Sequence, residues 1–322
     1  MKTSTTLLSA AIVAAVALTC LVFGPRPQAA AKGKPGGTPP PTGEIYFRAV
    51  DDEAQQYRLA VMNPDGTGKT FLPEVPANAQ PSYAIHDGDR WYLAFTETPG
   101  QFHPDGQPRG ILEAVREDGA ARVTIVDDPE MYYNETFCWS KDDAWISLSG
   151  YEWDATVSPP EPVAAALYVV PVQFIDGFGP VPLAAPAPVA DGGVWFSNPR
   201  FYPTIGSHDW SPEADRIVFS DYDRQTGSHL FIVDLAGDDV SPLAMTGSWP
   251  SWSPDGRLIA FRSSLSRTDK STIETIEADD TDESTRTILF DVKWSKGFTN
   301  TWVNAPHWSP TGSHLAFLFL QN

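Results

Sequence analysis

Six histidines are the side chains of this sequence best suited to bind a metal ion or to transfer protons, and two of them recur at one place in a repeated segment. His208 and His307 lie just before a tryptophan, and the carboxylate of Asp209 follows the first. The pair predicts either a metal or acid/base site, or ordinary polar residues at strand starts that bond to the backbone or to water. No third ligand recurs with them, which favours the second interpretation. The six are His86, His103, His208, His229, His307 and His314.

Carboxylates could supply a different chemistry, because most glycoside hydrolases use a pair of them. The spacing of the acids in the sequence does not place any two of them at a defined separation. The acidic run 277–283 (EADDTDE) lacks the ligand order of a calcium loop and predicts a solvated hairpin. The acids to consider for catalysis are Asp209, Asp154, Glu135 and Asp191.

Motifs of several enzyme classes are missing. The sequence contains no G-x-S-x-G nucleophile turn, no H-E-x-x-H, no C-x-x-C, no Walker loop and no G-x-G-x-x-G. We therefore expect no cofactor and no metal, and we assign no catalytic residue.

Composition indicates both the fold class and the kind of partner. The 322 residues include 41 Asp+Glu against 22 Lys+Arg, a net charge of −19, which argues against nucleic acid as a partner. With 30 Pro, 24 Gly and 42% hydrophobic residues, the chain favours many short strands around a large core. The expected fold class is all-β.

An internal repeat organises most of the chain. The segments PSWSPDGRLIAF from residue 250, PHWSPTGSHLAF from 306 and HDWSPEADRIVF from 208 are clear copies, with weaker ones from 137 and 81. In each copy W-S predicts a short strand, S-P-D-G a tight turn and I-A-F a second strand. Further strands are expected at 59–62, 167–170 and 230–233. Four antiparallel strands in each unit make a propeller blade, with an aromatic residue packed between neighbouring sheets. These aromatic residues are Tyr83, Trp139, Trp210, Trp252 and Trp308.

The motif P-x-W-S-P-D-G-x-x-I-A-F resembles the repeat of TolB-type β-propellers, and the resemblance covers residues 44–322. It implies a closed ring in which the strand at 306–309 returns to pair with the N-terminal strand at 43–50. Because the repeat begins shortly after the predicted cleavage site, we expect no counterpart of the amino-terminal α/β domain of TolB. The strand count fits a propeller of five or six four-stranded antiparallel blades, because the segment 314–320 is one strand more than five blades need.

The N-terminal region predicts export. Lys2, an apolar stretch and the run Ala29–Ala31 are the parts of a secretory signal peptide over residues 1–31, cleaved before Lys32. An uncleaved membrane anchor is the alternative. Residues 32–43 (KGKPGGTPPPTG) predict a flexible linker, followed by the propeller at 44–322. We expect a periplasmic or secreted monomer with no stable membrane insertion after cleavage and Cys138 as its one thiol.

The loops expected on one face of the propeller are long and aromatic, whereas those on the other are short and polar. This asymmetry indicates a recognition surface, although the rings could instead plug the channel. The favoured function is non-enzymatic binding of an envelope or extracellular protein, or of a polysaccharide. The alternatives are a carbohydrate-active hydrolase or lyase with carboxylates at the channel mouth, and a structural envelope component. The candidate binding residues are Tyr132, Tyr133, Trp153, Trp195, Arg200, Tyr202 and Trp302.

Overall fold

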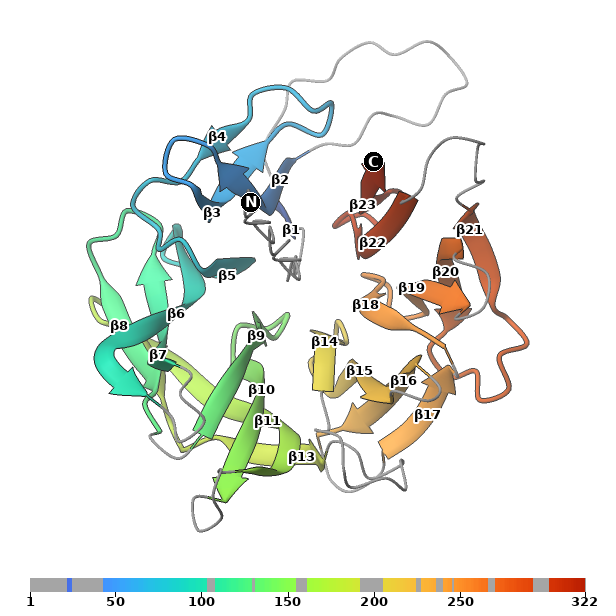
Figure 1. The fold of residues 1–322 in the computed structure, drawn as a ribbon. Helices are drawn as coiled ribbons and strands as arrows, with labels where there is room; N and C mark the ends of the chain where they lie inside the picture. Colours follow the sequence, from blue (N-terminus) through green and yellow to red (C-terminus); the bar gives the residue numbers. More distant parts are fainter. Residues whose placement is uncertain are drawn as a thin grey trace, which may run out of the picture.

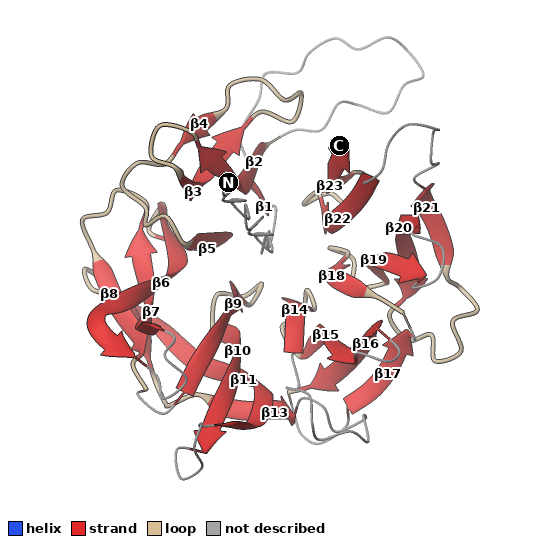
Figure 2. Cartoon of the chain, viewed as in Figure 1, coloured by secondary structure: helices blue, strands red, loops and turns tan. Residues whose placement is uncertain are grey.

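In the part of the chain that the computed structural model describes, the regular elements are strands, as Figure 2 shows. The structure describes residues 22–24, 43–102, 108–128, 131–154, 161–191, 205–223, 227–235, 240–244, 246–265, 270–291 and 301–321. No helix that could cross a membrane occurs in these ranges.

Five antiparallel sheets of four or five strands form the blades of a β-propeller, and a two-stranded sheet lies in the ring beside them (Figure 1). The expected all-β propeller is confirmed, with five complete blades. Blade 1 contains β1 (Val22–Gly24), β2 (Glu44–Asp51), β3 (Gln56–Met62) and β4 (Thr70–Phe71). Blade 2 contains β5 (Ala79–His86), β6 (Asp89–Phe102), β7 (Pro108–Arg116) and β8 (Arg122–Val126).

Blade 3 contains β9 (Met131–Trp139), β10 (Trp145–Asp154), β11 (Glu161–Ile175), β12 (Gly179–Pro182) and β13 (Ala187–Asp191). Blade 4 contains β14 (Ile205–Trp210), β15 (Arg216–Asp223), β16 (Gly227–Asp234) and β17 (Val240–Ala244). Blade 5 contains β18 (Ser248–Trp252), β19 (Leu258–Leu265), β20 (Lys270–Glu277) and β21 (Thr287–Asp291). The closing sheet contains β22 (Thr301–Trp308) and β23 (Leu315–Gln321).

The repeated serine after each tryptophan fixes the turn between the first and second strands. In blade 5 the hydroxyl of Ser253 accepts a hydrogen bond from the amide of Leu258 at 2.8 Å and donates one to Asp255 at 2.7 Å. Gly256 adopts a φ of 74°, the left-handed conformation that glycine tolerates best. The same bond recurs from Trp145 to Ser140, from Arg216 to Ser211 and from His314 to Ser309.

The repeated tryptophans pack between blades, as the sequence predicts. Trp210 is fully buried, and its indole nitrogen donates a hydrogen bond to the hydroxyl of Ser147 in blade 3 at 2.8 Å. Trp139 and Trp252 are also buried, Trp139 in a core cluster shared by blades 2 and 3 and Trp252 in one shared by blades 4 and 5. Their role is therefore to join sheets, not to bind a ligand.

Ring closure differs from the predicted pairing of N- and C-terminal strands. Among the described strands, β22 is hydrogen-bonded to β23, whereas β2 is bonded to β3 and to β1. The inner edge of β2 is therefore already occupied, so β22 has no ladder to join there. The two sides of the ring meet through side chains instead: Ala316 of β23 packs against Ile45 of blade 1, as do Phe47 and Met62.

The short strand β1 falls inside the segment that the sequence predicts as a signal peptide. It pairs with β2 through Val22 opposite Tyr46, Phe23 opposite Ile45 and Gly24 opposite Glu44. Cleavage before Lys32 would remove this strand from blade 1.

Candidate functional site

Asp209, on the inner strand β14, joins three blades through its carboxylate. Oδ1 accepts hydrogen bonds from Lys141 Nζ of blade 3 at 2.8 Å and from the amide of Trp210 at 3.0 Å. Oδ2 accepts one from the amide of Trp252 in blade 5 at 2.8 Å. The side chain is only 4% exposed. Both oxygens are engaged in packing the ring, so Asp209 is poorly placed to act as a catalytic carboxylate.

Serines on neighbouring inner strands make the same kind of link. The hydroxyl of Ser82 in blade 2 accepts a hydrogen bond from the amide of Trp139 in blade 3 at 3.1 Å. Ser207 of blade 4 accepts one from the amide of Trp249 in blade 5 at 2.8 Å. These bonds fix the distance between successive inner strands, and they satisfy amides that the meander of each blade leaves unpaired.

The repeated histidines are neutral groups enclosed by the ring. Burial lowers the pKa of His208 to about 4, although backbone groups of Gly206 and Ser147 and the charge of Asp209 oppose the shift. Burial also lowers the pKa of His307 to about 4, and His307 Nδ1 lies 3.2 Å from the hydroxyl of Ser251. A general acid or base works best with a pKa near the working pH. In the part of the chain that the structure describes, neither histidine belongs to a group of three metal-ligating side chains.

The other carboxylates considered for catalysis lie on strands of blade 3. Glu135 is in β9, Asp154 ends β10 and Asp191 ends β13. Their side chains lie outside the described residues, so no carboxylate pair is built from them. The acidic run 277–283 forms the turn between β20 and β21, as predicted, with Asp280 accepting hydrogen bonds from the amide and hydroxyl of Thr285 at 2.7 and 2.6 Å.

Four candidate binding residues lie in strands and not in the expected loops. Tyr132 and Tyr133 belong to β9, Trp153 to β10 and Trp302 to β22. The backbone pairing of β9, β10 and β11 continues beyond the body of the blade, because the β-branched and aromatic residues there suit extended strands. The register places Tyr132 opposite Tyr151. Trp195, Arg200 and Tyr202 lie outside the described residues.

Strand direction brings these residues to one rim of the propeller. In every blade the first strand starts, and the second strand ends, at the same edge of the meander. Tyr132, Tyr133 and Trp302 are near the starts of first strands, and Trp153 is near the end of a second strand. We call this edge the upper rim. The opposite edge, the lower rim, carries the turns after the first and third strands.

The upper rim also contains an exposed aromatic residue that the sequence reasoning missed. Tyr222 lies near the end of β15, at the same edge as Trp153, and it is 49% exposed. The signal was present: the segment after the I-V-F strand of this repeat ends in an aromatic residue between two aspartates. Because this aromatic residue continues a strand and does not belong to a long loop, the length and composition of the loops do not single it out.

Comparisons with known proteins establish the fold. No protein-family model matches the chain, and no curated protein matches it. The structure assigned as TolB from Agrobacterium tumefaciens is similar, with 14% identity over 87% of this chain and 86% of that one and a TM-score of 0.52. Puromycin hydrolase is similar over 89% of this chain, with 19% identity and a TM-score of 0.51.

The fold of this chain is thus that of a TolB-type β-propeller. The chain corresponds to only 40% of the length of puromycin hydrolase. A TolB protein and a hydrolase share this architecture, so the fold does not decide the activity.

Proposed function

We propose that this chain is an exported, non-enzymatic β-propeller that binds a protein or polymer partner through the upper rim. The observation that carries the proposal is the gathering of aromatic residues at that edge: the register pairs Tyr132 with Tyr151, and exposed Tyr222 and the backbone of Trp302 lie at the same edge. Aromatic residues are enriched among those that dominate binding energy at interfaces.

The shape of the two rims supports this choice. Strand β10 extends for 10 residues toward the upper rim and pairs with residues 161–171 of β11, whereas two-residue and three-residue turns close hairpins at the lower rim. Longer strands and loops provide a larger surface for a partner. The net charge of −19 favours a neutral or cationic partner. Export rests on the signal-peptide pattern of residues 1–31.

A binding assay with matched variants tests the proposal. Purified protein is immobilised and presented with solubilised envelope proteins and with defined neutral and cationic polysaccharides. A specific partner should bind at least about tenfold more weakly to Trp302→Ala or Tyr222→Ala, the loss expected at an aromatic hot spot. Phe178→Ala, an equally drastic truncation of a side chain that is 72% exposed at the lower rim, should leave binding unchanged.

Two results would contradict the proposal. Equal losses in Phe178→Ala and the upper-rim variants would show that the rim is not the recognition surface. Turnover of a glycan by the purified protein would favour the carbohydrate-active alternative.

A further inference from the structure

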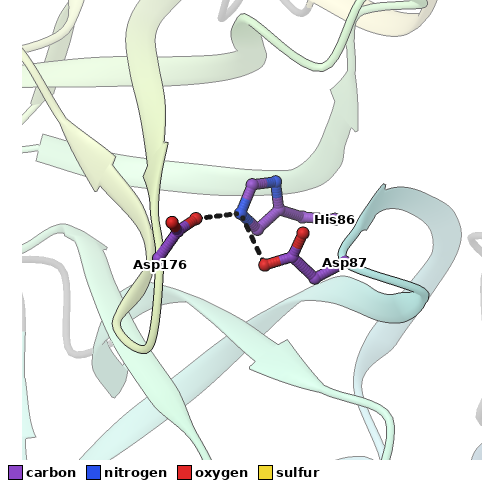
Figure 3. A group of neighbouring side chains, drawn as sticks. All are labelled: His86, Asp87 and Asp176. Carbon is purple, nitrogen blue, oxygen red and sulfur yellow. Dashed lines mark ion pairs between the residues drawn. The ribbon is translucent and has the colours of Figure 1, made fainter.

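A cluster of metal-ligating side chains lies at the lower rim, between blades 2 and 3 (Figure 3). His86 ends β5, Asp87 follows it in the turn to β6, and Asp176 lies in the turn between β11 and β12. His86 Nε2 is 3.5 Å from Asp87 Oδ2 and 3.4 Å from Asp176 Oδ1. All the potential ligand atoms lie within 4.8 Å of one another.

Two tight turns hold the carboxylates in place. Asp87 and Gly88 form a two-residue hairpin with φ values of 52° and 86°, which is the strongly preferred Asp-Gly turn. In the other hairpin Gly177 has a φ of 76°, and the amide of Phe178 donates a hydrogen bond to the carbonyl of Ile175 at 2.9 Å. The carboxylates therefore project from rigid backbone, although their side chains are 70% and 93% exposed.

The imidazole of His86 is oriented by a ring from the other blade. Phe174 of β11 stacks on it, with ring centroids 4.7 Å apart and an interplanar angle of 19°. Phe174 is itself held between Trp91 of blade 2 and Trp139 of blade 3. Nε2 is hidden from solvent and makes no hydrogen bond of normal geometry. A nitrogen that faces two carboxylate oxygens in this way can direct its lone pair at a cation between them.

The separations suit a small transition-metal ion. Zinc binds imidazole nitrogen and carboxylate oxygen at about 2.0–2.2 Å, so tetrahedral ligand atoms lie about 3.4 Å apart. The distances from His86 Nε2 to the two carboxylate oxygens match this separation between ligand atoms. Calcium and magnesium prefer sets of oxygen ligands, which an imidazole does not supply.

We propose that His86, Asp87 and Asp176 bind a divalent transition-metal ion of the zinc type, which joins blades 2 and 3. Because both carboxylates are largely exposed, water or a partner's side chain can take the remaining coordination position. The competing arrangement is an imidazolium ion paired with two carboxylates, with no metal.

Titration of chelator-treated protein with ZnCl₂ tests this site. Calorimetry should show one site per chain, with the Kd raised at least about tenfold in His86→Gln and in Asp176→Asn, since even losing an outer-shell partner costs that much. His314→Gln and Asp65→Asn, which remove the same chemical groups from turns elsewhere in the ring, control for weak binding to the acidic surface. They should leave the single site intact.

Two further measurements keep the result independent of folding defects. Zn²⁺ should raise the Tm of the native protein and of both controls, but not of the two site variants, because a ligand that binds only the folded state stabilises it. Co²⁺ should give the intense visible absorption of a tetrahedral centre. A native protein without a stoichiometric site, or site variants that bind Zn²⁺ as the native protein does, would overturn the proposal and leave the ion pair as the explanation.

Discussion

Asp209 shows how one buried side chain can link several blades. It is the nearly inaccessible acceptor for Lys141 and for the amides of Trp210 and Trp252. Hydrogen bonds to a charged group contribute more than neutral ones, and a buried donor left without a partner costs free energy. The carboxylate that the sequence suggested for catalysis thus holds neighbouring blades together.

Asp209→Asn should lower the free energy of unfolding by about 2–3 kcal/mol, because it replaces a charged acceptor that serves three donors. Urea denaturation measures the change. Asp279→Asn is a matched control: Asp279 also lies 2.8 Å from a cation, Arg216, but its side chain is 86% exposed. Solvent screens such a pair, so the control should show little change. Equal effects in the two variants would contradict the proposed role of Asp209.

His208 should make the folded state sensitive to mild acid. Its pKa is about 4 in the folded protein and about 6.5 when unfolded. Above pH 6.5 the group is neutral in both states, and the folded protein has its full stability. As the pH falls toward 4, the unfolded chain binds a proton that the folded chain does not, so stability is lost, by roughly 3 kcal/mol at most.

The unfolding free energy at pH 7 and pH 4.5 should therefore fall less in His208→Gln than in the native protein. His314→Gln, at a partly exposed turn, controls for loss of a histidine as such. Carboxylates titrate in both proteins and cancel in the comparison. If the native protein and His208→Gln lose the same free energy on acidification, His208 is not the group responsible.

At the scale of elements, the β11–β12 hairpin of blade 3 packs against blade 2. An added Cβ at Gly179 would lie 2.3 Å from Trp91 Cη2, whereas one at Gly177 would meet no atom within 4 Å. Both glycines have a positive φ, 91° and 76°. An alanine at either position would therefore be strained by the positive φ, but only an alanine at 179 would also clash with a neighbouring side chain.

Gly179→Ala should destabilise the protein by about 1–3 kcal/mol more than Gly177→Ala, the usual cost of overpacking. Denaturation midpoints with the m-value held constant give this difference. Gly179→Ala should also raise the Kd for Zn²⁺, because the same hairpin positions Asp176. Similar stabilities for the two variants would mean that the hairpin can shift away from Trp91 at little cost.

The sequence predicted the elements whose cause is local. The W-S strands, the turns that follow them and the third strands at 59–62, 167–170 and 230–233 are all present. A serine hydroxyl holds each turn within a few residues, and the apolar runs of the third strands suit buried strands. The lengths of β10 and β11 were not predictable, since they depend on how far the partner strand continues. The approach of Asp176 to His86 was equally hidden, because it depends on Gly179 fitting against Trp91 in another blade.

At the scale of the whole molecule, the ring has one seam that differs from the others. The closing sheet packs on blade 5, where Val303, Leu315 and Phe317 surround Ile273. The ring centroids of Phe317 and Phe290 are 4.9 Å apart. On its other side, Ala316 packs against the apolar group of blade 1. In the described residues, β23 pairs with β22 alone, and no ladder of hydrogen bonds crosses to β2.

The seam should therefore open before the rest of the ring. Backbone amides of β22, β23 and β2 should exchange with deuterium faster than those of β14–β16, because a two-stranded sheet held by side-chain contacts opens at a lower free energy than a four-stranded blade. Peptide-resolved hydrogen exchange by mass spectrometry measures this difference. Removal of residues 1–31 should widen it, because β1 then no longer pairs with β2. Equal protection around the ring, in the full and the shortened chain, would show instead that contacts such as Ile45 with Ala316 close the propeller as firmly as a shared sheet would.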